Sequence, residues 1–203
     1  MKTETSWHYD LGVFHRPMEK LETRVNFYYI DVSNYIVANA ADTFHAESTY
    51  GFNMNEIIFY GVEMEFNSVW SDKLTFFGNY TYRKTDYDEE ELYFKNASGA
   101  DLDVSPILLE IAPEHKANLG LRYRIWDKTL LTSDIRYVGK RESEGNVYTL
   151  DDFITVDVGM EYEFRENLKA HFFVGNVLGE EYQEIYGYPM PGRVYGVSMK
   201  ASF

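Results

Sequence analysis

Cysteine is absent from the 203 residues of this chain, and so is any long apolar run. Without thiols the chain has neither a disulfide framework nor thiolate chemistry. A transmembrane helix needs about 20 consecutive, mainly apolar residues, and no such stretch exists. Basic residues are outnumbered, with 19 against 33 acidic ones, so the formal net charge is −14. This balance argues against nucleic acid as a partner, because phosphate binding needs clustered Lys and Arg.

The beginning of the chain also lacks the pattern of an export signal. Residues 1–4 are polar and lead directly into alternating residues rather than into an apolar stretch. We therefore expect that a signal has been removed or that the chain is the tail of a longer protein.

What the chain does have is strict alternation of apolar and polar residues. Between Ile154 and Phe164 every second residue is apolar, and those between are Thr, Asp, Gly and Glu. This period predicts a β-strand with one apolar and one hydrated face. The last residues, from Val194 to Phe203, keep the same period and finish on an aromatic side chain, whereas most chain ends fray.

The alternation recurs nine times, which predicts an all-β protein of about nine strands, each near the length that crosses a bilayer when tilted. The predicted strands are Trp7–Val13, Leu21–Val37, Ile58–Phe66, Leu74–Tyr82, Ala117–Ile125, Leu131–Tyr137, Ile154–Phe164, Leu168–Val174 and Val194–Phe203. Short connections at 16–20, 71–73, 127–128 and 165–167 alternate with long ones at about 39–55, 86–113, 142–152 and 179–192. Such regular alternation predicts an antiparallel up-and-down meander with turns at one end and loops at the other.

Two architectures fit this pattern. Aromatic residues make up 17% of the chain and would form interfacial girdles in a transmembrane β-barrel, or core and surface filler in a soluble protein. The alternative to a membrane barrel is therefore a soluble or small self-closed β-barrel with an interior ligand cavity. The loop at 86–113 is the segment where we expect irregular or short helical structure.

The end of the chain carries motifs that resemble a known family. Residues 176–182 (Asn-Val-Leu-Gly-Glu-Glu-Tyr), the Pro-Met-Pro-Gly-Arg of 189–193 and the strand that ends at Phe203 resemble the end of a TonB-dependent outer-membrane receptor. The stretches 113–123 and 58–63 are similar to strand beginnings in that family. The resemblance extends over essentially the whole chain.

This resemblance implies a function and a set of partners. The family's barrels have 22 strands around a plugged lumen, and they take up scarce nutrients such as ferric siderophores, haem or cobalamin with energy passed through TonB. The chain would then be the last nine strands, with residues 1–203 forming the carboxyl-terminal portion of the barrel and no plug domain. Implied partners are outer-membrane lipid, the missing plug and strands, the TonB complex through the missing amino-terminal part, and the barrel-assembly machinery, in a Gram-negative outer membrane.

Candidate ligand-binding residues lie in the predicted outer loops. The sequence offers His45, and an aromatic cluster of Tyr182, Tyr186 and Tyr188. The tyrosines suit either a ligand platform or the upper aromatic girdle. No two of the five histidines have ligand spacing, so we expect no metal site and no cofactor. The acidic run at 86–91 could bind calcium but equally suits a solvated loop.

Charged residues on the polar face are candidates for contact with a plug. These are Arg83, Arg122, Arg124, Glu161 and Glu163. They predict either ion pairs to the plug or a hydrated interior. Neighbouring carboxylates are ordinary on such a face, so the sequence gives no support for an enzyme.

The last strand has a further interpretation. Its apolar positions are Tyr195, Val197, Met199 and the terminal Phe203. They resemble the carboxyl-terminal signal that the assembly machinery recognises, and the alternative is an ordinary last strand.

Overall fold

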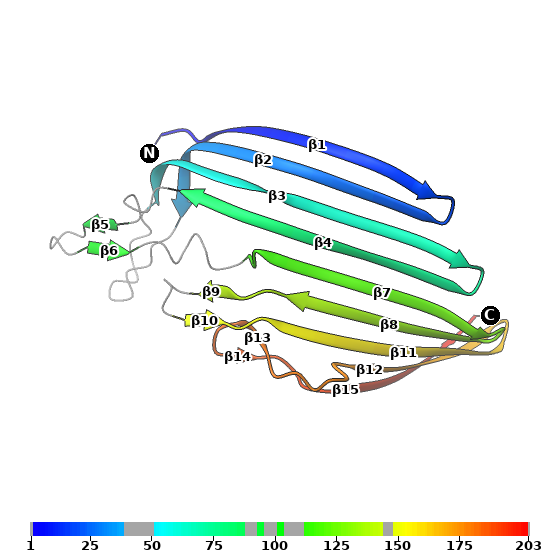
Figure 1. The fold of residues 1–203 in the computed structure, drawn as a ribbon. Helices are drawn as coiled ribbons and strands as arrows, with labels where there is room; N and C mark the ends of the chain where they lie inside the picture. The colour runs from blue at the N-terminus through cyan, green and yellow to red at the C-terminus, as the bar shows by residue number, and fades with distance from the viewer. Residues whose placement is uncertain are drawn as a thin grey trace.

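A computed structural model describes residues 2–38, 51–87, 93–95, 101–103, 112–143 and 148–202. Nine antiparallel strands form one sheet whose order follows the chain, so each strand pairs with its neighbours in sequence (Figure 1). They are β1 (Thr5–Met18), β2 (Leu21–Ala38), β3 (Gly51–Ser71), β4 (Leu74–Tyr87), β7 (His115–Trp126), β8 (Thr129–Val138), β11 (Phe153–Arg165), β12 (Leu168–Gly175) and β15 (Val194–Ala201). The nine predicted strands are confirmed.

The two ends of the sheet differ as the connection lengths predict. Tight turns join the strand pairs at one end, on the right of Figure 1, and the strand ends that border the long connections lie at the opposite end, which we call the loop end. Several strands are longer than their apolar alternation: β3 starts at Gly51, seven residues before the predicted start. The extension lies at the loop end, where pairing with β2 continues as far as Ala38 and Gly51.

Three small two-stranded ladders also lie at the loop end. They are β5 (Tyr93–Lys95) with β6 (Asp101–Asp103), β9 (Arg141–Ser143) with β10 (Tyr148–Leu150), and β13 (Gln183–Ile185) with β14 (Tyr188–Pro189). The first falls in the segment where the sequence suggested irregular or short helical structure. Its described residues pair as strands instead, because backbone groups of a local hairpin satisfy each other.

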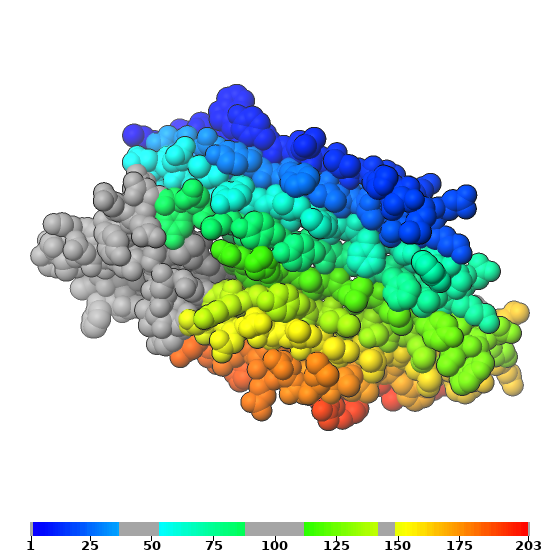
Figure 2. Space-filling model, viewed as in Figure 1, coloured from blue at the N-terminus to red at the C-terminus, as the bar shows by residue number. Residues whose placement is uncertain are grey.

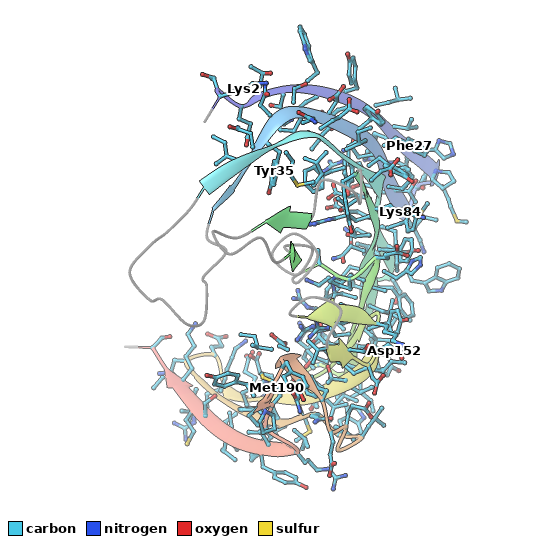
Figure 3. All side chains as sticks on the ribbon, turned by 90° about the vertical axis from the view of Figure 1, so that its left-hand side faces the viewer. Lys2, Phe27, Tyr35, Lys84, Asp152 and Met190 are labelled. Carbon is cyan, nitrogen blue, oxygen red and sulfur yellow. The ribbon has the colours of Figure 1, made fainter. Side chains whose placement is uncertain are left out.

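The sheet is strongly curved and remains open among the described residues. Viewed from the loop end, the strands trace an arc, with Phe27 on its convex side and Tyr35 on its concave side (Figure 3). Strand β1 pairs only with β2, and β15 pairs only with β12, so both edges lack a second partner in the described part of the chain. A small self-closed barrel, the alternative left open by the sequence, is therefore not the structure observed.

The strand register places the apolar residues on one continuous convex face. Leu11 stands opposite Phe27, which stands opposite Val62, and the same face continues strand by strand to Val197. Figure 2 shows the strands following one another as coloured bands across the wall. Many of these side chains are exposed, for example Trp7, Leu11 and Tyr195 at 70%, 63% and 68%. An apolar surface of this extent requires a nonaqueous environment or a partner.

Most of the few buried residues lie elsewhere, and Ala170 on the convex face of β12 is an exception. Buried apolar side chains include Met54 and Ile57, which are almost wholly inaccessible, and Phe153. Met54 and Ile57 belong to the extended loop end of β3 rather than to the middle of the wall. The described residues contain no helix that is long and apolar enough to cross a membrane.

Candidate functional site

The concave face of the sheet is polar and paired within itself. Its cross-strand partners include Arg24 with Glu65, whose charged atoms lie 3.6 Å apart, and Asn79 with Asn118, joined by a side-chain hydrogen bond of 2.9 Å. Period-2 alternation places these groups opposite the apolar face. We therefore call the concave face the inner wall and expect it to be hydrated.

Glu161 and Glu163 occupy this inner wall and share one cation. Lys169 Nζ on β12 lies 3.0 Å from Glu161 Oε1 and 3.3 Å from Glu163 Oε2. All three side chains are about one-third exposed. The two carboxylates named as plug contacts therefore already have a partner within the wall, and contact with a plug stays a prediction.

The three inner-wall arginines lie apart from these carboxylates. The guanidinium carbons of Arg83 and Arg122 stand 5.6 and 5.1 Å from the ring centroids of Phe59 and Phe77. Arg124 donates to the carbonyl oxygen of Asp127 at 3.1 Å, near the turn end. Stacking on rings leaves the edges of Arg83 and Arg122 available to further acceptors.

A compact corner follows β12 at the loop end. Asn176 is buried with φ of +50°, a conformation that Asn tolerates better than most residues. Its backbone N–H donates to Asp157 Oδ1 at 2.7 Å, and its side chain forms hydrogen bonds with the backbone N–H and carbonyl of Glu180. Arg193 Nε donates to the carbonyl of Val177 at 3.0 Å. The residues that carry the family resemblance thus fasten the last loop to β11.

A second cluster ties β9 to the last loop. Arg141 is 8% exposed and donates through Nη2 to the carbonyls of Gln183 and Glu184 at 2.8 and 3.0 Å. Burial lowers the pKa of Arg141, with Glu184 opposing this change and the nearby Arg136 adding to it. Arg136 Nη2 lies 2.7 Å from Glu184 Oε1. The cluster therefore holds two cations, one carboxylate and two accepting carbonyls, and Nη1 of Arg141 is buried without a hydrogen-bond partner among the described residues.

Aromatic rings cover this cluster. Both Arg136 and Arg141 stand over Phe153, at 5.4 and 5.8 Å from the ring centroid, and Tyr182 packs against the same ring at 4.2 Å. Arg141 and Phe153 were not anticipated from the sequence. An apolar Phe at the start of a strand, preceded by two aspartates, is too common a pattern to reveal such a role.

The remaining predicted residues are not brought together into one site. Tyr182 is half-buried, whereas Tyr186 and Tyr188 are exposed on the β13–β14 ladder. His45 and Phe203 lie outside the described residues. Tyr195, Val197 and Met199 project from the convex face of β15, where between 66% and 68% of each residue is exposed. No group of three or more His, Asp or Glu in the described part of the chain could hold a metal ion.

The formal net charge is concentrated in the long connections. The segments 39–50, 88–114, 139–152 and 176–193 contain 17 of the 33 acidic residues but only 4 of the 19 basic ones. They therefore account for −13 of the formal charge of −14. The rest of the chain is close to neutral as a group.

Taken together, these features define a class. A meander with an exposed apolar convex face, a self-paired polar concave face, short turns at one end and long loops at the other is part of the wall of a transmembrane β-barrel. Two edge strands without a second neighbour mark it as a segment of a larger barrel, because open edges are not tolerated against lipid.

The chain belongs to the TonB-dependent receptor family. The family model described as TonB dependent receptor-like, beta-barrel matches residues 1–177. Members are outer-membrane receptors and transporters of Gram-negative bacteria rather than enzymes. The sequence-based family, fold class and location are confirmed.

Individual relatives place the chain within longer proteins. It is 27% identical over 192 residues to the ferrioxamine receptor of Yersinia enterocolitica, a match that covers 90% of this chain and 24% of that receptor. The chain thus spans about a quarter of the length of this curated relative.

Solved structures show the same fold. The ferric-catecholate import receptor Fiu from E. coli K12 matches all of the chain and 28% of its own length, with a TM-score of 0.73 and 18% identity. The copper transporter OprC matches all of the chain and 32% of its own length, with a TM-score of 0.72 and 17% identity. The pyoverdine receptor FpvA of Pseudomonas aeruginosa PAO1 gives a TM-score of 0.72, with 18% identity over 98% of this chain and 30% of its own.

Proposed function

We propose that residues 1–203 are the carboxyl-terminal portion of a receptor barrel that takes up a scarce nutrient across the outer membrane. The observation that carries this proposal is the nine-stranded amphipathic sheet with two unpaired edges. In a 22-stranded barrel these would be the last nine strands. The terminal position is supported by the tail motif, which builds the corner at Asn176 and leads directly into β15.

The partners follow from the two faces and the two edges. Outer-membrane lipid covers the convex face, further barrel strands pair with β1 and β15, and a plug fills the concave side. TonB acts through the amino-terminal part of the receptor, and the assembly machinery recognises β15 with Phe203. Relatives named for ferrioxamine, ferric catecholate, pyoverdine and copper support a metal complex or metal ion as the ligand class.

Because the chain has no native cysteine, cysteine labelling can test the orientation of the wall directly. Leu119 and Asn118 are adjacent on β7, and register places them on the convex and concave faces. Leu119→Cys and Asn118→Cys would be placed in the receptor in outer-membrane vesicles. We expect a membrane-confined maleimide to label Cys only at 119 and a water-soluble maleimide to label Cys only at 118. Equal labelling of both by the water-soluble reagent would exclude a lipid-facing wall.

Uptake tests the functional part of the proposal. Deleting the gene region that encodes this chain should abolish growth on the receptor's ligand under metal limitation, and restoring it should recover growth. Candidate ligands are ferric hydroxamates, ferric catecholates and copper. A deletion strain that takes up all of them at the normal rate would contradict the proposal.

A further inference from the structure

The concave wall contains a cavity at the loop end, bordered by the Asn176 corner, Tyr182 and the Asn79–Asn118 pair. Its volume is about 440 Å³, and it lies between the inner face of β7, β8 and β11 and the last loop at 190–192. Met190, which lines the cavity, belongs to the part of the chain that folds back within the arc of strands in Figure 3. The opening therefore faces the same side as the polar inner wall.

Two carboxylates face each other across the floor of this cavity. Asp134 on β8 and Asp157 on β11 are direct cross-strand partners on the concave face, and both line the cavity. Like charges in this arrangement repel each other. Asp157 accepts one hydrogen bond, from the backbone N–H of Asn176, and no ion pair of the described residues involves either carboxylate. The pair therefore lacks a counter-charge.

A threonine hydroxyl lies beside the carboxylates. Thr155, two residues before Asp157 on the same face, is only 7% exposed and lines the cavity. Its hydroxyl has no hydrogen-bond partner among the described residues, and its oxygen is accessible rather than fully buried. A ligand that offers a donor at this position can therefore bond to this oxygen.

The neighbouring cation does not neutralise the pair. Arg136 is the cross-strand partner of Thr155, but its guanidinium is paired with Glu184 at 2.7 Å and stacks over Phe153. The side-chain amides of Asn79 and Asn118 on the cavity wall are joined to each other. The groups in the cavity that lack a counter-charge or a hydrogen-bond donor are thus two negatively charged carboxylates and one hydroxyl.

We propose that this cavity binds an ammonium or guanidinium group. Such a group donates to Asp134, Asp157 and Thr155 at once and supplies the missing positive charge. A bare metal ion fits less well, because no third acidic or histidine ligand converges here. This proposal depends on the proposed function in one respect, which is that the concave face lines the lumen of the barrel.

The cationic group has two sources that one titration can separate. One is a free solute, for which Nα-acetyl-L-arginine amide, called arginine amide below, serves as the probe. The other is a basic side chain of a protein segment inside the lumen, represented by the capped peptide Gly-Gly-Arg-Gly-Gly. The control ligand is the neutral isostere Nα-acetylcitrulline amide, called citrulline amide below. Binding to the whole receptor in detergent micelles would be measured by calorimetry at low and high salt.

Matched variants isolate the site from general electrostatics. The double variant Asp134→Asn with Asp157→Asn removes the facing carboxylates, and Asp151→Asn with Asp152→Asn removes the same charge from the exposed segment before β11. We expect the first to weaken binding of arginine amide at least tenfold and the second less than twofold. Thr155→Val, which keeps the shape of the side chain, should weaken it three- to tenfold.

The outcomes decide both the site and its source. A peptide that binds at least tenfold more tightly than arginine amide assigns the site to a protein segment, and comparable affinities assign it to a free solute. Equal losses in the two double variants, equal binding of citrulline amide, or no binding of either cation would overturn the proposal. If the first double variant does not fold, Thr155→Val alone decides. Cysteine labelling at 118 and 119 tests the orientation of the wall separately, so a failure of the cation site can be distinguished from a failure of the proposed function.

Discussion

Replacing Phe27 by Arg tests whether the convex face lies in lipid. Phe27 is in the middle of the apolar stripe of β2, opposite Leu11 on β1 and Val62 on β3. It is 46% exposed, so nearly half of its surface is open to the surrounding medium. A guanidinium at this position would replace an aromatic ring with a charge surrounded by apolar side chains.

The neighbouring residue provides the control. Asn26 lies on the concave face, opposite Gly12 and Glu63. Asn26→Arg makes the same change in charge but places the guanidinium beside a carboxylate on a hydrated face, where an exposed ion pair contributes about 0–1 kcal/mol. In contrast, Arg on the lipid face of a barrel costs about 2–4 kcal/mol at the midplane of the bilayer. The two variants should therefore differ by about 2–4 kcal/mol, or roughly 30- to 1,000-fold in the folding equilibrium.

The assay is urea-dependent folding of the whole receptor into phospholipid vesicles. Folded and unfolded protein would be separated by their different mobility in unheated gels, and tryptophan fluorescence would give an independent transition. Equal stability of Phe27→Arg and Asn26→Arg would refute the assignment of faces. A loss at Asn26 that exceeds the loss at Phe27 would reverse it.

Three further predictions concern close contacts. A Cβ at Gly120 would lie 2.2 Å from Cζ of Phe77, so Gly120→Ala should destabilise the fold by about 1–3 kcal/mol in the same urea titration, and adding Phe77→Leu should recover part of the loss. Asn176→Ala removes the side-chain hydrogen bonds with Glu180 and places Ala at φ +50°, so it should cost about 1–3 kcal/mol and more than Asn176→Gly; equal losses would contradict a role for the backbone angle. Arg141→Met removes two hydrogen bonds to the last loop and should speed proteolysis at 183–187 severalfold without unfolding the sheet, whereas unchanged cleavage would show that the loop is held by other contacts.

The sequence predicted the strands well because alternation records the face of each residue. All nine main strands were found, with the turns at one end and the loops at the other. Strand limits were less accurate on β3, since its first residues extend beyond the part where alternation is regular. The ladder of β5 and β6 was missed because three-residue strands are too short to show a period.

The candidate site was predictable only in part. Strand register places Arg83, Arg122, Arg124, Glu161 and Glu163 opposite the apolar face, and their contact with a plug stays a prediction. Alternation could not show that Lys169 joins the two glutamates, because that contact depends on the register between β11 and β12. For the same reason Asp134 and Asp157, which are distant in sequence, were not recognised as a facing pair.

The amino-acid sequence by itself determined which side of each strand is apolar, how the strands follow one another, and the family to which the chain belongs. These properties are local, because a period of two residues and the lengths of connections can be read without knowing the partners of a strand. Only the tertiary structure decided the register, and with it the sharing of Lys169, the packing of Tyr182 on Phe153, and the cavity above Asp134. A shift of register by one residue would leave the composition of each strand unchanged and alter every one of these contacts.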